Sequence, residues 1–369
     1  MTGVGALVSA ALMVGATPPA PPPAAPAPST SVTRKAGPAG SLLIIEEDHS
    51  VPLVHVIVAS RSGSAADPRH REGLTNLAAE WARHGAGGRS RTELDEALDA
   101  LGGTLEVHTE QDHTRFEGEV LARNLDAYLS IVADILIRPT FSPAELARTR
   151  QEIEGQIDET RNDDRLLCGR FYLGNVYGEH PYGHPVDGLP ASLKAATAAE
   201  TAAHFRQHFG GQNLIFAFSG DVEPEALSAT LAKKFKGLSA APAPPPNALE
   251  LRKPVSLTGW RIQLVDKPDR QQTQLMFGHP TLRASDPDYV ALQVALAAFG
   301  GRAMSSTMMD EVRRKRGLAY GAYMLLEERR GNGATLGWVF SGTDKTVATL
   351  KLVLKLYVTF MEKGLSPKD

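Results

Sequence analysis

The fold is decided first by the stretch SLLIIEEDHSVPLVHVIVA, residues 41–59. It contains two runs rich in β-branched and apolar residues, 41–47 and 51–59, on either side of a polar turn, and such runs are typical of strands. A helical pattern follows at residues 72–84. The globular part of the chain therefore opens with two strands and a helix.

The same order occurs again in the stretch RIQLVDKPDRQQTQLMF, residues 261–277. Its runs 261–266 and 272–277 predict two strands, and residues 288–299 predict a helix that ends at a Gly-Gly pair. A repeat of this kind predicts two homologous structural units.

Hairpins extend the repeat in both halves. In the first half, residues 91–101 predict a helix, and residues 104–109 and 114–121 predict an antiparallel hairpin. Residues 320–327 and 334–341 mirror that hairpin in the second half. We therefore expect an α+β fold with two homologous domains, each a mostly antiparallel sheet packed by helices on one face.

The repeat breaks off at the end of the chain. A helix predicted at residues 125–137 precedes Ser142, a good N-cap, and Pro143, which suits the first helical position. In the second half, the helix predicted at 345–363 is followed by LSPKD at 365–369. The second domain is therefore expected to be truncated at its C-terminus.

The composition excludes several classes of protein. A chain of 369 residues is long enough for two domains with their own cores. Its 39 Lys+Arg and 42 Asp+Glu give a net charge of −3, so no nucleic-acid partner is expected. Cys168 is the one cysteine, which excludes an internal disulfide and a thiolate metal cluster.

Two segments rich in proline divide the chain. Residues 1–38 form an Ala/Pro-rich, signal-like segment that is expected to be disordered, and its apolar run is too short to span a bilayer. We expect export to the periplasm or cell envelope, and otherwise a cytoplasmic protein. The remaining boundaries are an N-terminal domain at 39–239, a Pro-rich linker at 240–254 and a C-terminal domain at 255–369.

Several local motifs resemble those of the pitrilysin/insulinase-type metallopeptidases, the inverzincin group that includes mitochondrial processing peptidase. They are GLT at 73–75, HGAGGRS at 84–90, HPYG at 180–183 and DEVRRKRGLAY at 310–320. The resemblance covers residues 41–369. It implies the two-domain fold expected from the repeat.

The resemblance also implies where a zinc site would lie. In the family, two His of HxxEH and a downstream Glu bind zinc, and the Glu within HxxEH is the general base. The corresponding positions here are Asn76, Ala79, Glu80 and Gln156. An amide is a weak zinc ligand and Ala79 accepts no proton, so the resemblance implies no metal and no cofactor in this chain.

The pattern around these positions leaves two interpretations open. Asn76 and Glu80 fit the exposed side of an amphipathic helix. Alternatively, Glu80 and His84 are four residues apart and could belong to a relocated metal site, for which no third ligand is evident.

Two further histidine pairs have simpler explanations. His180 and His184 are each followed directly by a proline, which indicates a turn in a loop. His204 and His208 lie within a helical pattern at 195–209 and are expected on its solvated face.

The second domain retains a different family feature. Arg313 and Tyr320 keep the spacing of an Arg and Tyr that, in the family, bind substrate and hydrogen-bond the tetrahedral oxyanion. The alternative is that Arg313 is one charge in a basic helix end and Tyr320 is a core residue at the start of a strand.

These features together predict a subunit without zinc. In this family, some members are heterodimers in which one subunit holds zinc and the other supplies the Arg/Tyr pair. We expect the chain to pair with an HxxEH-bearing homologue that carries the zinc, to close a chamber around unfolded peptides and to contribute Arg313 and Tyr320 in trans. The alternatives are a purely structural family member and a metallopeptidase with a relocated metal site.

Overall fold

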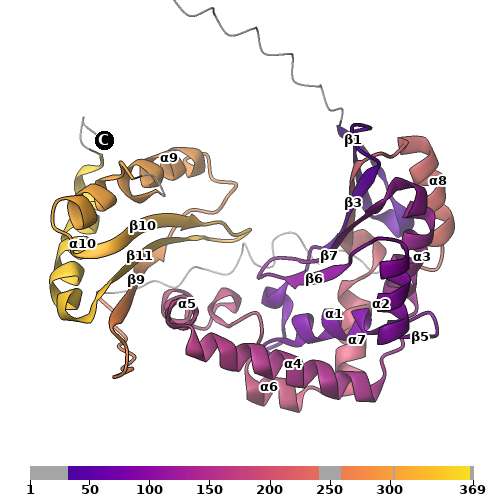
Figure 1. Cartoon of the computed structure of the whole chain (residues 1–369), viewed down its shortest axis with the longest axis horizontal. Helices are drawn as coiled ribbons and strands as arrows, with labels where there is room; N and C mark the ends of the chain where they lie inside the picture. The colour runs from indigo at the N-terminus through magenta and orange to yellow at the C-terminus, as the bar shows by residue number, and fades with distance from the viewer. Residues whose placement is uncertain (1–31, 241–258, 302–303, 366–369) are drawn as a thin grey trace, which may run out of the picture.

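The structure is a computed structural model that describes residues 32–240, 259–301 and 304–365. The predicted signal-like segment therefore lies outside the described residues up to residue 31, and so does nearly all of the predicted Pro-rich linker. The described residues form two α+β units (Figure 1).

The first unit is built on a six-stranded sheet in the order β1-β2-β8-β3-β7-β6, in which only β2 and β8 are parallel. Its strands are β1 Val32–Ala36, β2 Leu42–Glu47, β3 Leu53–Ser60, β6 Glu106–Thr109, β7 Thr114–Leu121 and β8 Leu214–Gly220. The short strands β4 Gly85–Ala86 and β5 Arg89–Ser90 pair separately. The predicted hairpin of 104–109 and 114–121 is confirmed. The prediction that the chain is disordered through residue 38 was wrong. Residues 32–36 form strand β1, which gains hydrogen bonds by pairing with β2.

Helices cover one face of this sheet and surround its edge (Figure 1). They are α1 Leu74–Arg83, α2 Arg91–Ala100, α3 Leu125–Ile137, α4 Pro143–Asn162, α5 Asp164–Tyr177, α6 Pro190–Ala195, α7 Ala198–His208 and α8 Pro224–Lys234. Alternate residues of the strands, such as Val54, Val56 and Val58, pack against α3 side chains such as Tyr128 and Ile135. Helix α1 packs against α7, α4 and strand β6.

The second unit has a three-stranded antiparallel sheet in the order β10-β11-β9. Its strands are β9 Gln272–Pro280, β10 Ala319–Glu327 and β11 Ala334–Gly342. Its helices are α9 Tyr289–Gly300, the π-helical turn η6 Met309–Arg314 and α10 Thr346–Lys363. All three lie over one face, where Phe299, Met308, Val339, Val353 and Phe360 form the core. The predicted two-unit α+β architecture is confirmed.

One predicted strand is absent from the described part of the second unit. Residues 261–266 form no strand and no helix, and Ile262 and Leu264 are largely exposed. In the first unit the corresponding strand β2 obtains its hydrogen bonds from β1 and β8. The described residues of the second unit include no counterpart of either neighbour, so this apolar segment has no neighbouring strand with which to pair.

The two units contact each other through α5 and through the tip of the β10–β11 hairpin, which points toward the first unit (Figure 1). Tyr172 of α5 donates a hydrogen bond to the carbonyl oxygen of Thr335, 2.5 Å away. Tyr172, Tyr177, Tyr182 and Ala334 share a buried cluster across the boundary. Among the described helices, none is long and apolar enough to cross a membrane.

Candidate functional site

Helix α1 carries the positions at which the family places its zinc ligands. It starts after Gly73, whose φ of 91° is left-handed and whose Cα leaves no room for a Cβ beside Gly188. Asp67 accepts hydrogen bonds from the backbone N–H groups of Gly73 and Thr75, both at 2.7 Å, and from the Thr75 hydroxyl at 2.6 Å. The otherwise free donors at the helix start are thus satisfied, which fixes α1 at its N-terminal end.

The four predicted positions lie on two helices that pack against each other. Asn76, Ala79 and Glu80 lie on α1, whereas Gln156 lies on α4 and is exposed. The prediction that Asn76 is exposed was wrong, because its side chain is 7% exposed. Helix α1 is buried on most of its circumference, since α4, α7 and the sheet all pack against it.

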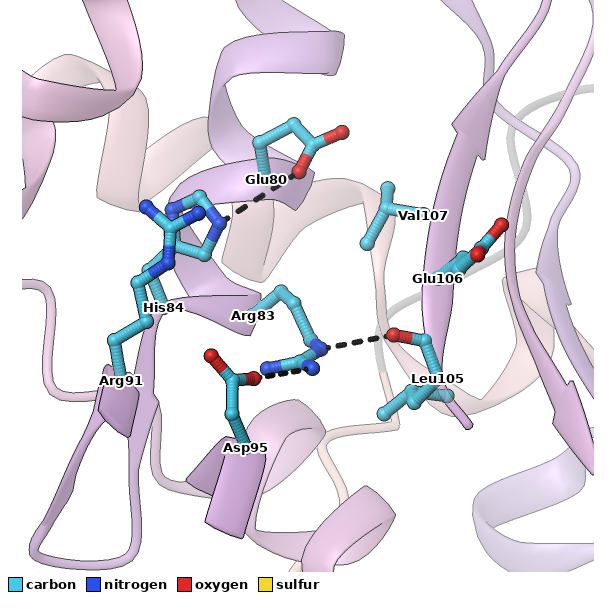
Figure 2. A pocket seen from close by; sticks show the side chains of 8 residues that line it. All are labelled: Glu80, Arg83, His84, Arg91, Asp95, Leu105, Glu106 and Val107. Carbon is cyan, nitrogen blue, oxygen red and sulfur yellow. Dashed lines mark hydrogen bonds and ion pairs between the residues drawn. The ribbon is translucent and has the colours of Figure 1, made fainter. Parts of the chain in front are cut away.

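A polar cavity of about 280 Å³ opens next to this helix (Figure 2). It is lined by Glu80, Arg83, His84, Arg91, Asp95, Leu105, Glu106 and Val107. The side chains converge from α1, α2 and the start of edge strand β6, so the cavity lies between the helix and a strand with an unpaired edge.

The hydrogen bonds of His84 assign its tautomer. The Thr149 hydroxyl donates its hydrogen to the carbonyl oxygen of Glu145 at 2.8 Å, and His84 Nδ1 lies 2.8 Å from the same hydroxyl oxygen. Because that oxygen has no second hydrogen, Nδ1 must be the donor. In neutral His84, Nε2 then carries a lone pair that faces Glu80 Oε2 at 3.9 Å.

Burial favours the neutral forms of both groups. Desolvation raises the pKa of Glu80 to about 7, against the attraction of Arg83 and Arg91. Desolvation also lowers the pKa of His84 to about 4, assisted by Arg91. Near neutral pH, His84 is therefore neutral and Glu80 is only partly ionised, with 3.9 Å between His84 Nε2 and Glu80 Oε2.

Two arginines border the cavity, and each holds a carboxylate. Arg83 bonds Asp95 Oδ1 at 2.7 Å and the Leu105 carbonyl at 3.1 Å, as Figure 2 shows. Arg91 Nη1 reaches both oxygens of Glu152, at 2.8 and 3.0 Å. Sequence reasoning missed these pairs, since Arg91 and Glu152 are far apart in the chain and carry no motif.

The residues present do not fit zinc. Among the described residues, no three His, Cys, Asp or Glu side chains are grouped to hold a metal ion. Glu80 and His84 share a face, but the next carboxylate, Glu152, is held by Arg91. Asp95, another carboxylate of the lining, is held by Arg83.

The other histidine pairs give one confirmation and one correction. His180 caps the turn Pro181–Gly183 through Nδ1, which accepts from the Tyr182 N–H, so the predicted turn is confirmed. The solvated face predicted for His204 was wrong: its side chain is buried, and Nε2 lies 2.8 Å from Thr75 Oγ1. Burial lowers its pKa to about 3. His208 lies 2.9 Å from Ser62 Oγ, on the same side of α7.

The structure brings Arg313 and Tyr320 together in the second unit. The Arg313 guanidinium lies over the Tyr320 ring, 4.7 Å from its centroid, and the tyrosine is 71% exposed. Tyr320 is therefore not the core residue of the alternative interpretation. The pair lines a second cavity of about 370 Å³.

Two family models match the chain. The model described as "Insulinase (Peptidase family M16)" matches residues 42–188, and the model described as "Peptidase M16 inactive domain" matches residues 195–369. Together they cover the chain from residue 42 to its last residue, apart from residues 189–194.

Curated relatives carry related names. An "uncharacterized zinc protease" of Mycobacterium leprae is 26% identical over 83% of this chain and 68% of its own length. A protein of the same description from Streptomyces coelicolor is 26% identical, and the chain spans 64% of its length. A "probable mitochondrial-processing peptidase subunit beta" of Arabidopsis thaliana is 26% identical over 74% of this chain and 51% of that protein.

Solved structures share the fold. An M16 inactive-domain structure from Pseudomonas fluorescens superposes with a TM-score of 0.83 at 22% identity, covering 92% of this chain and 81% of that one. A protease from Helicobacter pylori gives 0.78 at 17% identity, with 92% and 82% covered. Pitrilysin gives 0.69 at 17% identity, with 92% of this chain and 37% of pitrilysin covered.

Proposed function

The chain belongs to the insulinase family of peptidases (M16), and we propose that within this family it is a zinc-less subunit that supplies Arg313 and Tyr320 to the active site of a zinc-bearing partner. Its partner is an HxxEH-bearing homologue, and its substrate is an unfolded peptide enclosed between the two subunits.

One observation carries the proposal: the family's zinc-binding positions hold other residues in this chain, whereas the Arg/Tyr pair is present. Around α1, the zinc positions hold a buried amide, a methyl group and a desolvated carboxyl group, and the fourth position is exposed. In the second unit, by contrast, Arg313 and Tyr320 are stacked and reachable from solvent. A group that acts on another chain's substrate must be accessible in this way.

The first unit offers a means of holding a peptide. Strand β6 forms one edge of its sheet, and residues 105–107 at its start line the polar cavity. An extended peptide can add to such an edge through main-chain hydrogen bonds, which requires no particular side chains. Binding through main-chain hydrogen bonds suits an unfolded peptide, because it does not require a particular amino-acid sequence.

Reconstitution with an HxxEH-bearing homologue from the same organism tests the proposal. We expect neither chain alone to cleave unfolded peptides at the rate of the mixture. Arg313→Lys keeps the charge but loses the planar guanidinium, so turnover should fall by about 100-fold if that group holds substrate in the transition state.

Arg314→Lys is the matched control, because Arg314 is adjacent but bonds Asp310 in the exposed helix end. Equal turnover for Arg313→Lys and Arg314→Lys in assembled complexes would contradict a role for Arg313. A chain that cleaves peptides alone would contradict the zinc-less assignment.

A further inference from the structure

The cavity beside Tyr320 has an unusual balance of charge. It is lined by Gln272, Arg313, Gly317, Leu318, Ala319, Tyr320, Phe340, Ser341, Gly342 and Lys345. Two of these residues are cations and none is acidic. The chain as a whole has a net charge of −3, so a cavity lined only by cations differs from the overall charge balance.

The cations of the cavity differ from their neighbours in their partners. Three basic residues follow Arg313, and each bonds a carboxylate of Asp310 or Glu311: Arg314, Lys315 and Arg316. Among the described residues, Arg313 has no carboxylate partner; its contacts are the Tyr320 ring and the Met304 sulfur, 3.6 Å from Nη1.

Lys345 approaches the cavity from a separate element. It lies at the start of α10, and its Nζ donates a hydrogen bond to the carbonyl oxygen of Gly317 at 3.0 Å. This bond holds the ammonium group at the cavity and leaves two of its three hydrogens free for other acceptors. No ion pair to a described residue neutralises it.

A buried donor completes the arrangement. Ser341 lines the same cavity and is 2% exposed, yet its hydroxyl has no hydrogen-bond partner among the described residues. A buried hydroxyl without a partner is unfavourable, so an acceptor that enters the cavity would be favoured.

We propose that this cavity is a carboxylate-binding subsite, in which Lys345 and Arg313 hold an acidic side chain or the C-terminal carboxylate of an extended peptide. The exposed ring of Tyr320 forms one wall, against which the neighbouring part of the peptide can pack. The choice of a peptide as ligand rests on the proposed function. Binding itself needs only this chain, so it can be measured without the partner.

Four short coumarin-labelled peptides test the assignment with the purified chain. They share a neutral sequence, carry Asp or Asn at the centre and end in a free carboxylate or an amide. We expect a peptide with a carboxylate at one of these places to bind about tenfold more tightly than its neutral match at low salt, and the advantage should shrink as salt is added. The four peptides separate a side-chain carboxylate from a terminal one.

Lys345→Gln should abolish most of that advantage, whereas Lys351→Gln should not, because Lys351 is an exposed lysine of α10 outside the cavity. Ser341→Ala gives a second test that leaves both charges in place, and it should reduce the advantage by a few fold. Circular dichroism verifies that each variant is folded.

Three outcomes would overturn the proposal. They are equal affinity for acidic and neutral peptides, an advantage that survives Lys345→Gln, and displacement by inorganic phosphate without any preference among the peptides. The proposed function fails by a different result, namely full turnover of a complex that lacks the Tyr320 hydroxyl, and that result would leave the binding data standing.

Discussion

At the scale of single residues, burial determines the chemistry around α1. Glu80 occupies a position that the family uses for a zinc ligand, but here its carboxyl group faces the lone pair of His84 and lies between two arginines that are already paired. Neutral forms of Glu80 and His84 avoid the cost of burying charge. Glu80 and His84 are therefore expected to respond to pH through their shifted pKa values.

Glu80→Gln tests this description through stability. The pKa of Glu80 is raised from 4.5 to about 7 in the folded protein, so the folded state retains a proton that the unfolded state releases. The contribution of Glu80 to the free energy of unfolding therefore falls as pH rises from about 4.5 to about 7. Relative to the wild type, the variant should gain about 2 kcal/mol between pH 5 and pH 8 in urea unfolding.

Glu96→Gln, on the exposed side of α2, is the matched control and should show no such gain. The pH dependence expected from His84 has the opposite sign. Its pKa is lowered from 6.5 to about 4, so its contribution to the free energy of unfolding is lost as pH falls below 6.5. Parallel unfolding curves for Glu80→Gln and the wild type at both pH values would contradict a raised pKa of the half-buried Glu80.

Metal content gives a second test at this scale. We expect the purified chain to retain no stoichiometric zinc after dialysis, since the positions on α1 and α4 offer zinc one desolvated carboxyl group and two amides. Elemental analysis measures this directly. About one zinc per chain that disappears in His84→Ala would instead support a relocated site at Glu80 and His84.

At the scale of elements, α1 depends on a cap supplied from outside the helix. Asp67 accepts three hydrogen bonds from Gly73 and Thr75, and Thr75 in turn contacts His204 of α7. The start of α1 is thus tied to a second helix. Without Asp67, those donors would be left unsatisfied in a largely buried place.

Asp67→Ala should therefore destabilise the protein by about 2 kcal/mol, which combines the loss of a cap with unsatisfied buried donors. Urea unfolding followed by tryptophan fluorescence, to which Trp81, buried on α1, contributes, measures the effect. Asp99→Ala is the control, because Asp99 is an exposed residue of α2. It should lower the free energy of unfolding by less than about 0.5 kcal/mol. Equal losses for the two variants would show that α1 does not depend on this cap.

The elements also show what a sequence can and cannot predict. Helix α3 and the hairpin of β6 and β7 were predictable because their periodicity is local. The unpaired segment at 261–266 was not, since strand formation there depends on neighbours from distant parts of the chain. The burial of Asn76 and His204 was missed for a related reason: it depends on helices that pack from two sides.

Some residues of the candidate site could be predicted from the sequence and others could not. The pairing of Arg313 and Tyr320 was implied by the resemblance of residues 310–320 to the family motif, and in the structure the guanidinium lies 4.7 Å from the centroid of the tyrosine ring. Lys345 carried no signal, since a single lysine before a helix is common and its approach to Gly317 depends on the packing of α10. Arg83 and Asp95 were likewise joined only by tertiary structure.

At the scale of the whole molecule, a polar contact fixes one unit against the other. Asp112, in the β6–β7 turn, accepts hydrogen bonds from the Arg330 N–H at 2.7 Å and from the Tyr182 hydroxyl at 2.6 Å. The Tyr182 hydroxyl in turn accepts from the Gly331 N–H at 2.9 Å. The tip of the β10–β11 hairpin is thereby held to the first unit.

Asp112→Ala should release this tip without unfolding either unit. We expect the amides of Arg330 and Gly331 to exchange hydrogen about tenfold faster, while amides in the core of β11, such as that of Val339, keep their protection. Hydrogen exchange followed by mass spectrometry measures both. Unchanged exchange at the tip, or loss of protection throughout the second unit, would contradict a local contact between folded units.

The turnover of an assembled complex that carries Tyr320→Phe tests the central claim most directly. The change removes one hydroxyl and keeps the ring that stacks under Arg313, so assembly and the partner's zinc content should not change. If the hydroxyl stabilises the oxyanion in the partner's active site, turnover should fall by about 100-fold or more.

Tyr323→Phe is the matched control, because that tyrosine lies in the same strand but packs against Trp338, with ring centroids 5.4 Å apart. The account predicts a large loss of turnover for Tyr320→Phe and none for Tyr323→Phe. A zinc-loaded Tyr320→Phe complex that cleaves unfolded peptides at the wild-type rate would contradict it.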